Sequence, residues 1–135
     1  MPHFRTPGPN AKWYLSKYRF RTVANFCLQY RELKAESQDI SGIKGVTYTG
    51  MPHGSGVGDP TARQAERIAE ASLKVEIIER NVKLVAGELS YWMIRGLTEE
   101  NMTYDKLRYE EGMPLPRNYY SQMRREIYWR IAQEI

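Results

Sequence analysis

The sequence has few residues of the types that hold metals or act as catalytic bases: one cysteine, Cys27, and two histidines, His3 and His53. A single cysteine cannot form an intramolecular disulfide or a thiolate metal cage, so we expect a reduced, cytoplasmic protein. Neither histidine stands near a cysteine, another histidine or a cluster of carboxylates, and no nucleophile is flanked by a base. We therefore predict no metal site, no cofactor and no enzymatic activity.

Long hydrophobic runs are also missing, because no uninterrupted apolar run is longer than four residues. A membrane-spanning helix needs about 20 apolar residues, and a signal peptide needs an apolar stretch behind positive charge, so we expect neither. Hydrophobic residues make up 41% of the chain and charged residues 27%. These shares favour an elongated protein over one with a deep core.

The net charge of +4 is unevenly distributed along the chain. Residues 1–36 carry seven basic and two acidic groups, residues 113–135 carry four and two, and residues 97–112 carry two basic and five acidic groups. Basic ends are compatible with nucleic-acid binding, although a solvated surface explains so mild an excess about as well.

Residues 1–36 are expected to form an N-terminal arm followed by a helix from about Ala11 to Glu36, because neither glycine nor proline interrupts that stretch. Aromatic and basic residues alternate near its start. Such residues can stack on bases and neutralise phosphates, but aromatics at helical spacing also serve as packing groups, and both interpretations stay open. The alternating residues are Lys12, Trp13, Tyr14, Lys17, Tyr18, Arg19, Phe20 and Arg21.

Residues 37–59 contain six glycines and are expected to form a linker. A phosphate-binding loop is a poor alternative, because the Lys-Ser/Thr pair that ends such a loop is absent and no apolar strand leads into it.

A long amphipathic helix is predicted over residues 60–96. Asp59 suits its N-cap, Pro60 its first position and Gly96 its end. Apolar residues alternate at spacings of three and four, which predicts packing or oligomerisation along one seam. The seam consists of Ile68, Ala71, Val75, Ile78, Val82, Val85, Leu89 and Trp92.

A second, narrower apolar stripe on the same helix indicates that it contacts two neighbours. One is expected to be the first helix, folded back through the linker, and the other the same helix of a second protomer. A hairpin within one chain and a homo-oligomer therefore both remain open. The second stripe consists of Leu73, Ile77, Leu84 and Tyr91.

Residues 97–135 are predicted to form a helix-turn-helix-like pair. Thr98 is the expected N-cap of a short helix that ends near Glu111, and a Pro-rich connection leads to a last helix from about Pro116. The expected buried face of that helix is Tyr120, Met123, Ile127, Ile131 and Ile135.

Polar and basic residues gather at the start of the last helix, where a helix-turn-helix protein contacts the major groove. Arginine can bond guanine, and asparagine and glutamine can bond adenine, while Tyr119 and Arg124 are expected on the phosphate side. The predicted DNA-binding residues are Arg117, Asn118, Tyr119, Ser121, Gln122, Arg124 and Arg125.

Two runs resemble small phage and prophage regulators of the RinA and ArpU type: Gly50–Ala65 (GMPHGSGVGDPTARQA) and Pro116–Arg125 (PRNYYSQMRR). The resemblance covers most of the chain from about Tyr18. It implies a C-terminal helix-turn-helix like that of sigma region 4, with Asn118–Arg125 as the recognition helix. The residues that match the pattern are Tyr119, Tyr120, Arg124 and Arg125.

Together these patterns predict an all-α protein with an N-terminal helix (1–36), a Gly-rich linker (37–59), a long central helix (60–96) and a DNA-binding module (97–135). The predicted function is a phage or prophage transcriptional regulator that binds double-stranded DNA as a homo-oligomer. The alternative is a non-catalytic helical assembly protein, such as a small phage packaging subunit or a binder of host RNA polymerase.

Overall fold

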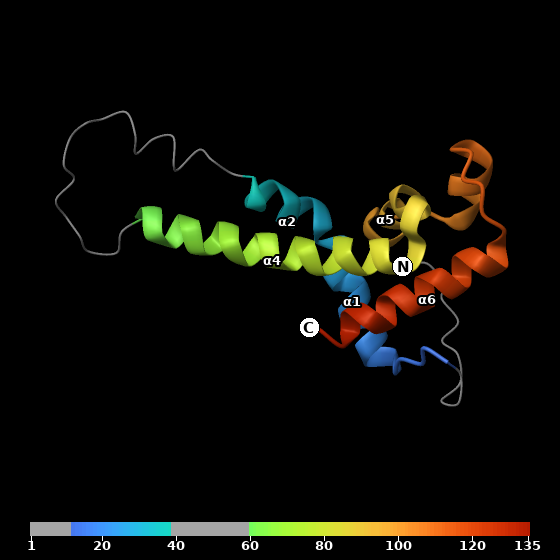
Figure 1. The fold of residues 1–135 in the computed structure, drawn as a ribbon, viewed down its shortest axis with the longest axis horizontal. Coiled ribbons are helices and arrows are strands. Elements are labelled where there is room, and N and C mark those ends of the chain that lie inside the picture. The colour runs from blue at the N-terminus through green and yellow to red at the C-terminus, as the bar shows by residue number, and fades with distance from the viewer. Residues whose placement is uncertain (1–11, 39–59) are drawn as a thin grey trace. The chain divides into compact units, whose positions relative to one another are not determined.

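The computed structural model describes residues 12–38 and 60–135, and all regular secondary structure in those two ranges is helical. The all-α prediction is therefore confirmed (Figure 1). The predicted arm, most of the linker and the Asp59 cap lie outside the described residues. The helices are α1 (Lys17–Leu28), α2 (Tyr30–Ser37), α4 (Pro60–Ala86), the 3₁₀ turn η1 (Gly87–Leu89), α5 (Ser90–Thr98), the π-helical turn η2 (Lys106–Glu110) and α6 (Arg117–Ala132).

The described residues form two compact units. Residues 12–30 and 77–135 make up the first, which we call the main unit, and residues 31–38 and 60–76 make up the second. The main unit holds α1, α5, α6 and the end of α4. Leu33, Ala71 and Val75 are the buried apolar side chains of the second unit.

The N-terminal helix differs from the single helix predicted over residues 11–36. It begins at Lys17, because the Ser16 hydroxyl caps it by accepting a hydrogen bond from the Arg19 amide at 3.4 Å. It breaks at Gln29, whose amide donates to the Phe26 carbonyl three residues back. The break falls next to the boundary between the two units, so the chain changes unit where the sequence shows no glycine or proline.

The long helix is shorter than predicted and ends at Ala86 instead of Gly96. Gly87 adopts a φ of +55°, a left-handed conformation that ends many helices and favours glycine. After the 3₁₀ turn, the chain continues as a separate helix, α5. Gly96 lies inside α5 and is buried, so its predicted role as the helix end is wrong.

The short helix before the connection also starts later than predicted. Thr98 is the last residue of α5, where its hydroxyl donates to the Ile94 carbonyl at 2.6 Å, so it does not cap a following helix. The Thr103 hydroxyl instead accepts from the Lys106 amide at 3.2 Å, at the start of η2.

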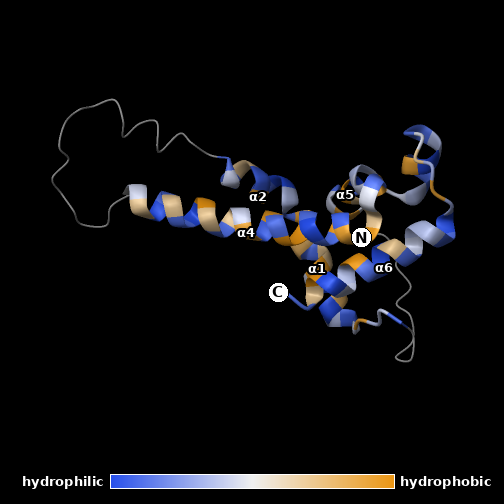
Figure 2. Ribbon diagram, in the orientation of Figure 1, coloured by the Kyte–Doolittle hydropathy of each residue, from blue (hydrophilic) through white to orange (hydrophobic). Residues whose placement is uncertain are grey.

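The core of the main unit forms where α1, the end of α4, α5 and α6 meet. Two edge-to-face aromatic pairs join α1 and the residues before it to α6: Phe20 with Tyr128, at 5.4 Å between ring centroids, and Trp13 with Trp129, at 5.2 Å. In Figure 2, orange hydrophobic residues alternate with blue hydrophilic ones along these helices. The largest fully buried side chains are Val23, Cys27, Ile78, Val82, Met93, Leu97, Leu107, Met113, Ile127 and Ile131.

The predicted seam of the long helix is used for packing within the chain. Ile78 and Val82 are fully buried in the main unit's core, against which Val85, Leu89 and Trp92 pack while partly buried. In the second unit, Val75 and Ala71 are buried and Ile68 is partly buried. Ile78 and Val82 are thus not available to a second protomer.

The second predicted stripe is mostly exposed. Ile77 is buried, whereas Leu73, Leu84 and Tyr91 are exposed. Within the two described ranges, no helix is both long enough and apolar enough to cross a membrane.

Candidate nucleic-acid interface

The connection between η2 and α6, residues 111–116, is held by backbone and side-chain hydrogen bonds. The Met113 amide donates to the Leu107 carbonyl at 2.9 Å, and Arg108 donates to the Met113 carbonyl at 3.0 Å. The Tyr104 hydroxyl donates to the Leu115 carbonyl at 2.6 Å. Met113 and Leu115 are themselves buried, so the loop is fixed at both ends.

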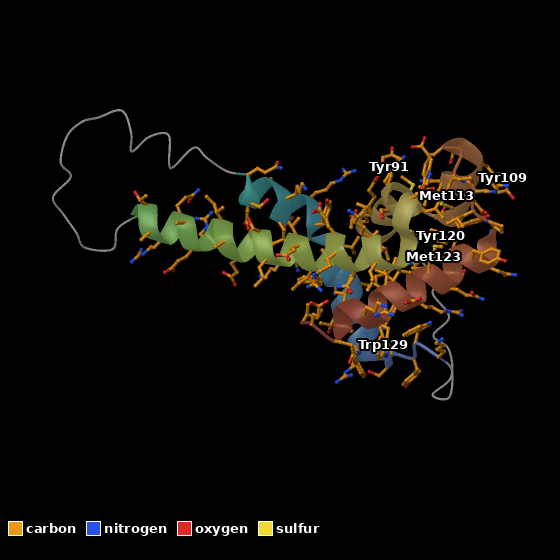
Figure 3. All side chains as sticks on the ribbon, in the orientation of Figure 1. Tyr91, Tyr109, Met113, Tyr120, Met123 and Trp129 are labelled. Carbon is orange, nitrogen blue, oxygen red and sulfur yellow. The ribbon has the colours of Figure 1, made fainter. Side chains whose placement is uncertain are left out.

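This connection is longer than the three- or four-residue turn of a standard helix-turn-helix. Gly112 adopts a φ of +81°, which allows the chain to reverse directly after η2. Figure 3 shows Met113 and Tyr120 on the side that faces α5, and Tyr109 pointing outward from η2. The pair is therefore helix-turn-helix-like, with an ordered loop in place of the tight turn.

Helix α6 presents a polar face over its first two turns. Asn118, Tyr119 and Gln122 are exposed, and the start of the helix is blue to white in Figure 2. The opposite side carries Tyr120, Ile127 and Ile131, all buried. Spacings of three and four residues along each side produce this division at 3.6 residues per turn.

Two predicted members of the buried side differ from the sequence pattern. Met123 is only partly buried, and Ile135 is exposed because α6 ends at Ala132. The buried anchor of α6 is therefore shorter than the apolar pattern predicts.

Arg117 begins α6 and is mostly exposed, with 62% of its side chain accessible. Its guanidinium lies 2.6 Å from an Asp105 carboxylate oxygen and 4.6 Å from the centre of the Tyr104 ring. An ion pair this exposed contributes little stability, so a phosphate or a base can replace Asp105 at small cost.

Arg124, which was predicted to contact DNA, lies away from the exposed polar face of α6. Its residue is only 8% exposed and lies on the buried side of α6, where it donates to the Tyr128 hydroxyl at 3.2 Å. Burial works to lower the pKa of Arg124, but the neighbouring Tyr128 and Tyr120 outweigh it and hold that pKa above its usual range. Arg124 therefore does not belong to the exposed polar face of α6.

Ser121 and Arg125, the remaining predicted DNA contacts, are partly exposed. The Arg125 Nε is buried and has no hydrogen-bond partner within residues 12–38 and 60–135. Arg125 stands seven residues after Asn118 and three after Gln122, on the same side of α6, but its side chain is partly covered.

The acidic residues of the 97–112 segment are partly neutralised by one arginine. Arg95 bonds Glu99 at 2.8 Å and Glu111 at 2.7 Å, and these two hydrogen bonds hold its pKa above the usual range. The Arg95 bridge reduces the negative potential that this segment would otherwise place beside α6.

The aromatic and basic residues near α1 divide between packing and solvent. Trp13 and Phe20 pack on α6, which accounts for them as structural groups. Tyr18 is exposed, with Lys17 and Arg21 at 6.0 and 5.8 Å from its ring centre. Packing within the chain thus explains Trp13 and Phe20, whereas Tyr18 remains accessible to solvent.

No protein-family model matches the chain, and comparisons with curated proteins and with solved structures find no similar protein.

Proposed function

We propose that the chain is a transcriptional regulator that binds double-stranded DNA through the polar face at the start of α6. One observation carries this proposal: Asn118 and Gln122 are exposed, one turn apart, on a helix whose opposite side is anchored by Tyr120 and Ile127. Such a helix can enter the major groove without unpacking the core.

The side chains of this face have the chemistry of base recognition. The amides of Asn118 and Gln122 can pair with the N6 and N7 groups of adenine, and the Arg117 guanidinium with the O6 and N7 groups of guanine. The Tyr119 hydroxyl can donate to a phosphate, which positions the helix without reading sequence. The free amides at the start of α6 add positive potential next to the phosphates.

The resemblance of Pro116–Arg125 to RinA- and ArpU-type proteins supports a regulatory role encoded by a phage or prophage. The burial of Arg124 removes one of the residues that carry this resemblance from direct DNA contact. Arg117 and the two amides on the polar face then carry most of the recognition.

A second candidate is a helical assembly protein that binds another protein, such as a packaging subunit or host RNA polymerase. Leu84 and Tyr91 favour it, because both are large apolar side chains that remain exposed on α4 and α5. These residues can also serve a homo-oligomer, which the fully buried Ile78 and Val82 cannot.

The test compares two glutamines of similar exposure near the two ends of α6. Gln122→Ala removes an amide from the polar face, and Gln133→Ala removes one from the residue that follows the helix. Affinity for a duplex selected from a random pool is measured by fluorescence anisotropy. Loss of a bidentate base contact corresponds to roughly 1–3 kcal/mol, or about 5- to 150-fold in affinity.

We expect Gln122→Ala to weaken binding to the selected duplex and to relax preference at one base step, while Gln133→Ala binds as the native chain does. Tyr119→Phe should weaken binding to all duplexes alike, because a phosphate contact carries no sequence information. Equal affinities of the two glutamine variants would contradict recognition by this face.

A further inference from the structure

The main unit contains a pocket of about 420 Å³ on the side of α6 opposite to the polar face. Its size lies in the range of small-molecule sites, about 300–1,000 Å³. Three elements supply its walls, all within the main unit: α1, the segment from Gly96 to Lys106, and α6. Its apolar lining consists of Phe20, Ala24, Leu28, Leu97 and Met102.

Arg124 gives this pocket a buried positive charge. Arg124 belongs to the lining although the residue is only 8% exposed, and it stays protonated at any pH at which the protein is folded. The Tyr128 ring, also in the lining, lies 5.4 Å from the guanidinium carbon. A charge that is largely removed from solvent acts more strongly than one at a solvated surface.

The other charged residues of the lining affect the pocket less. Glu99 is bonded to Arg95 at 2.8 Å, so its charge is already compensated. Glu100 and Lys106 are exposed, where solvent and salt screen them. The most deeply buried charge of the lining is therefore that of Arg124.

We propose that this pocket binds a small organic anion, a carboxylate carried on an apolar body. The carboxylate would receive charge-assisted hydrogen bonds from Arg124, and the apolar body would lie against Phe20, Leu97 and Met102. Because Arg124 belongs to α6, such a ligand would contact the helix that we propose to bind DNA. An effect on DNA binding rests on that proposed function, whereas ligand binding itself does not.

The test uses decanoate as the probe and the full chain as the receptor, with isothermal titration calorimetry as the readout. Decyltrimethylammonium has the same alkyl chain with the opposite charge, and acetate has the carboxylate without the apolar body. We expect saturable 1:1 binding of decanoate, with both comparison compounds at least about tenfold weaker. Equal binding of the cation, or no saturable binding of decanoate, would overturn the proposal.

Two leucine variants locate the binding. Leu28→Glu introduces a carboxylate at a partly exposed lining position, and Leu84→Glu makes the same change on α4 outside the lining. We expect Leu28→Glu to weaken decanoate binding at least about tenfold, because like charges repel, and Leu84→Glu to leave it unchanged. Equal affinities of the two variants would refute the assignment to this pocket.

Arg124→Met removes the charge while keeping a long side chain. We expect it to abolish the preference for decanoate over decyltrimethylammonium, and a preserved preference would contradict the role of Arg124. If this variant fails to fold, as far-UV circular dichroism would show, the Leu28→Glu comparison still decides. None of these readouts involves DNA, so failure of this proposal and failure of the DNA-binding proposal can be told apart.

Discussion

Replacing Gly96 with alanine should destabilise the protein through one specific contact. A Cβ atom on this buried glycine of α5 would lie closer than 3.0 Å to the Tyr120 hydroxyl oxygen of α6, and 3.2 Å from the Leu107 Cδ1. Tyr120 is itself buried, so it cannot move aside without disturbing the core. The glycine thus permits the close approach of α5 and α6 that sets the position of the polar face.

Two opposing effects determine how Gly96→Ala changes the free energy of unfolding. Overpacking a tight core costs about 1–3 kcal/mol, while alanine gains roughly 0.5–1 kcal/mol over glycine inside a helix. The difference is centred near 1 kcal/mol, so we expect Gly96→Ala to lower the free energy of unfolding by about 1 kcal/mol. At about 4–8 °C per kcal/mol for a unit of this size, the midpoint of thermal unfolding should fall by roughly 4–8 °C.

A double-mutant cycle with Tyr120→Phe isolates the contact. The buried Tyr120 hydroxyl makes no hydrogen bond of standard geometry in the described part of the chain, although the adjacent Arg124 interacts with it, so Tyr120→Phe should change stability less than Gly96→Ala does. In that background Gly96→Ala should cost about 1 kcal/mol less than in the native chain, as urea unfolding would measure.

Gly87→Ala provides the control for this cycle. Its Cβ would meet open space, although its φ of +55° strains any other residue. Its cost should therefore be the same with Tyr120 and with Phe at position 120. If the losses of unfolding free energy caused by Gly96→Ala and Tyr120→Phe are additive, the contact with the Tyr120 hydroxyl does not explain the destabilisation by Gly96→Ala.

Two further predictions concern the core. Val82→Asp places a charge at a fully buried position and should unfold the chain, whereas Leu84→Asp at an exposed position should change stability by less than about 0.5 kcal/mol. Far-UV circular dichroism and sedimentation measure the two outcomes. A Val82→Asp variant that stays folded as a monomer would instead show that the seam joins protomers. Burial raises the pKa of the Cys27 thiol from 9.0 to about 12, so the stability that its protonated form contributes should be lost as pH rises from about 9 to 12. Measured by urea unfolding, the free energy of unfolding should decline less steeply across that pH range for Cys27→Val than for the native chain. An identical pH dependence of the two proteins would contradict a contribution from Cys27.

The sequence predicted helices better than it predicted where they end. Apolar spacing identified the all-α fold and the buried positions Ile78 and Val82. It placed the end of the long helix at Gly96, whereas the helix ends before Gly87, whose φ is +55°, and Gly96 lies inside α5 against Tyr120. The break at Gln29 has no local signal, since it follows from the passage between two units.

The sequence predicted only part of the candidate site, because the charge of a residue does not show which side of a helix is buried. Asn118, Tyr119 and Gln122 are exposed as their polarity suggests. Arg124 was assigned to the surface by its charge, although it stands four residues after Tyr120 and seven before Ile131, on the buried side. Helical spacing was the signal that could have corrected this. The pocket around Arg124 could not be predicted, because α1 and α6 meet only through tertiary packing.

Selection of bound duplexes from a random pool, followed by affinity measurements over a salt series, tests the proposed function most directly. We expect enrichment of one motif, with an affinity that falls steeply as salt rises because phosphate contacts release counterions. We also expect Gln122→Ala to alter the motif. Weak binding that no sequence enriches and that salt abolishes would contradict DNA recognition and favour a protein partner at Leu84 and Tyr91.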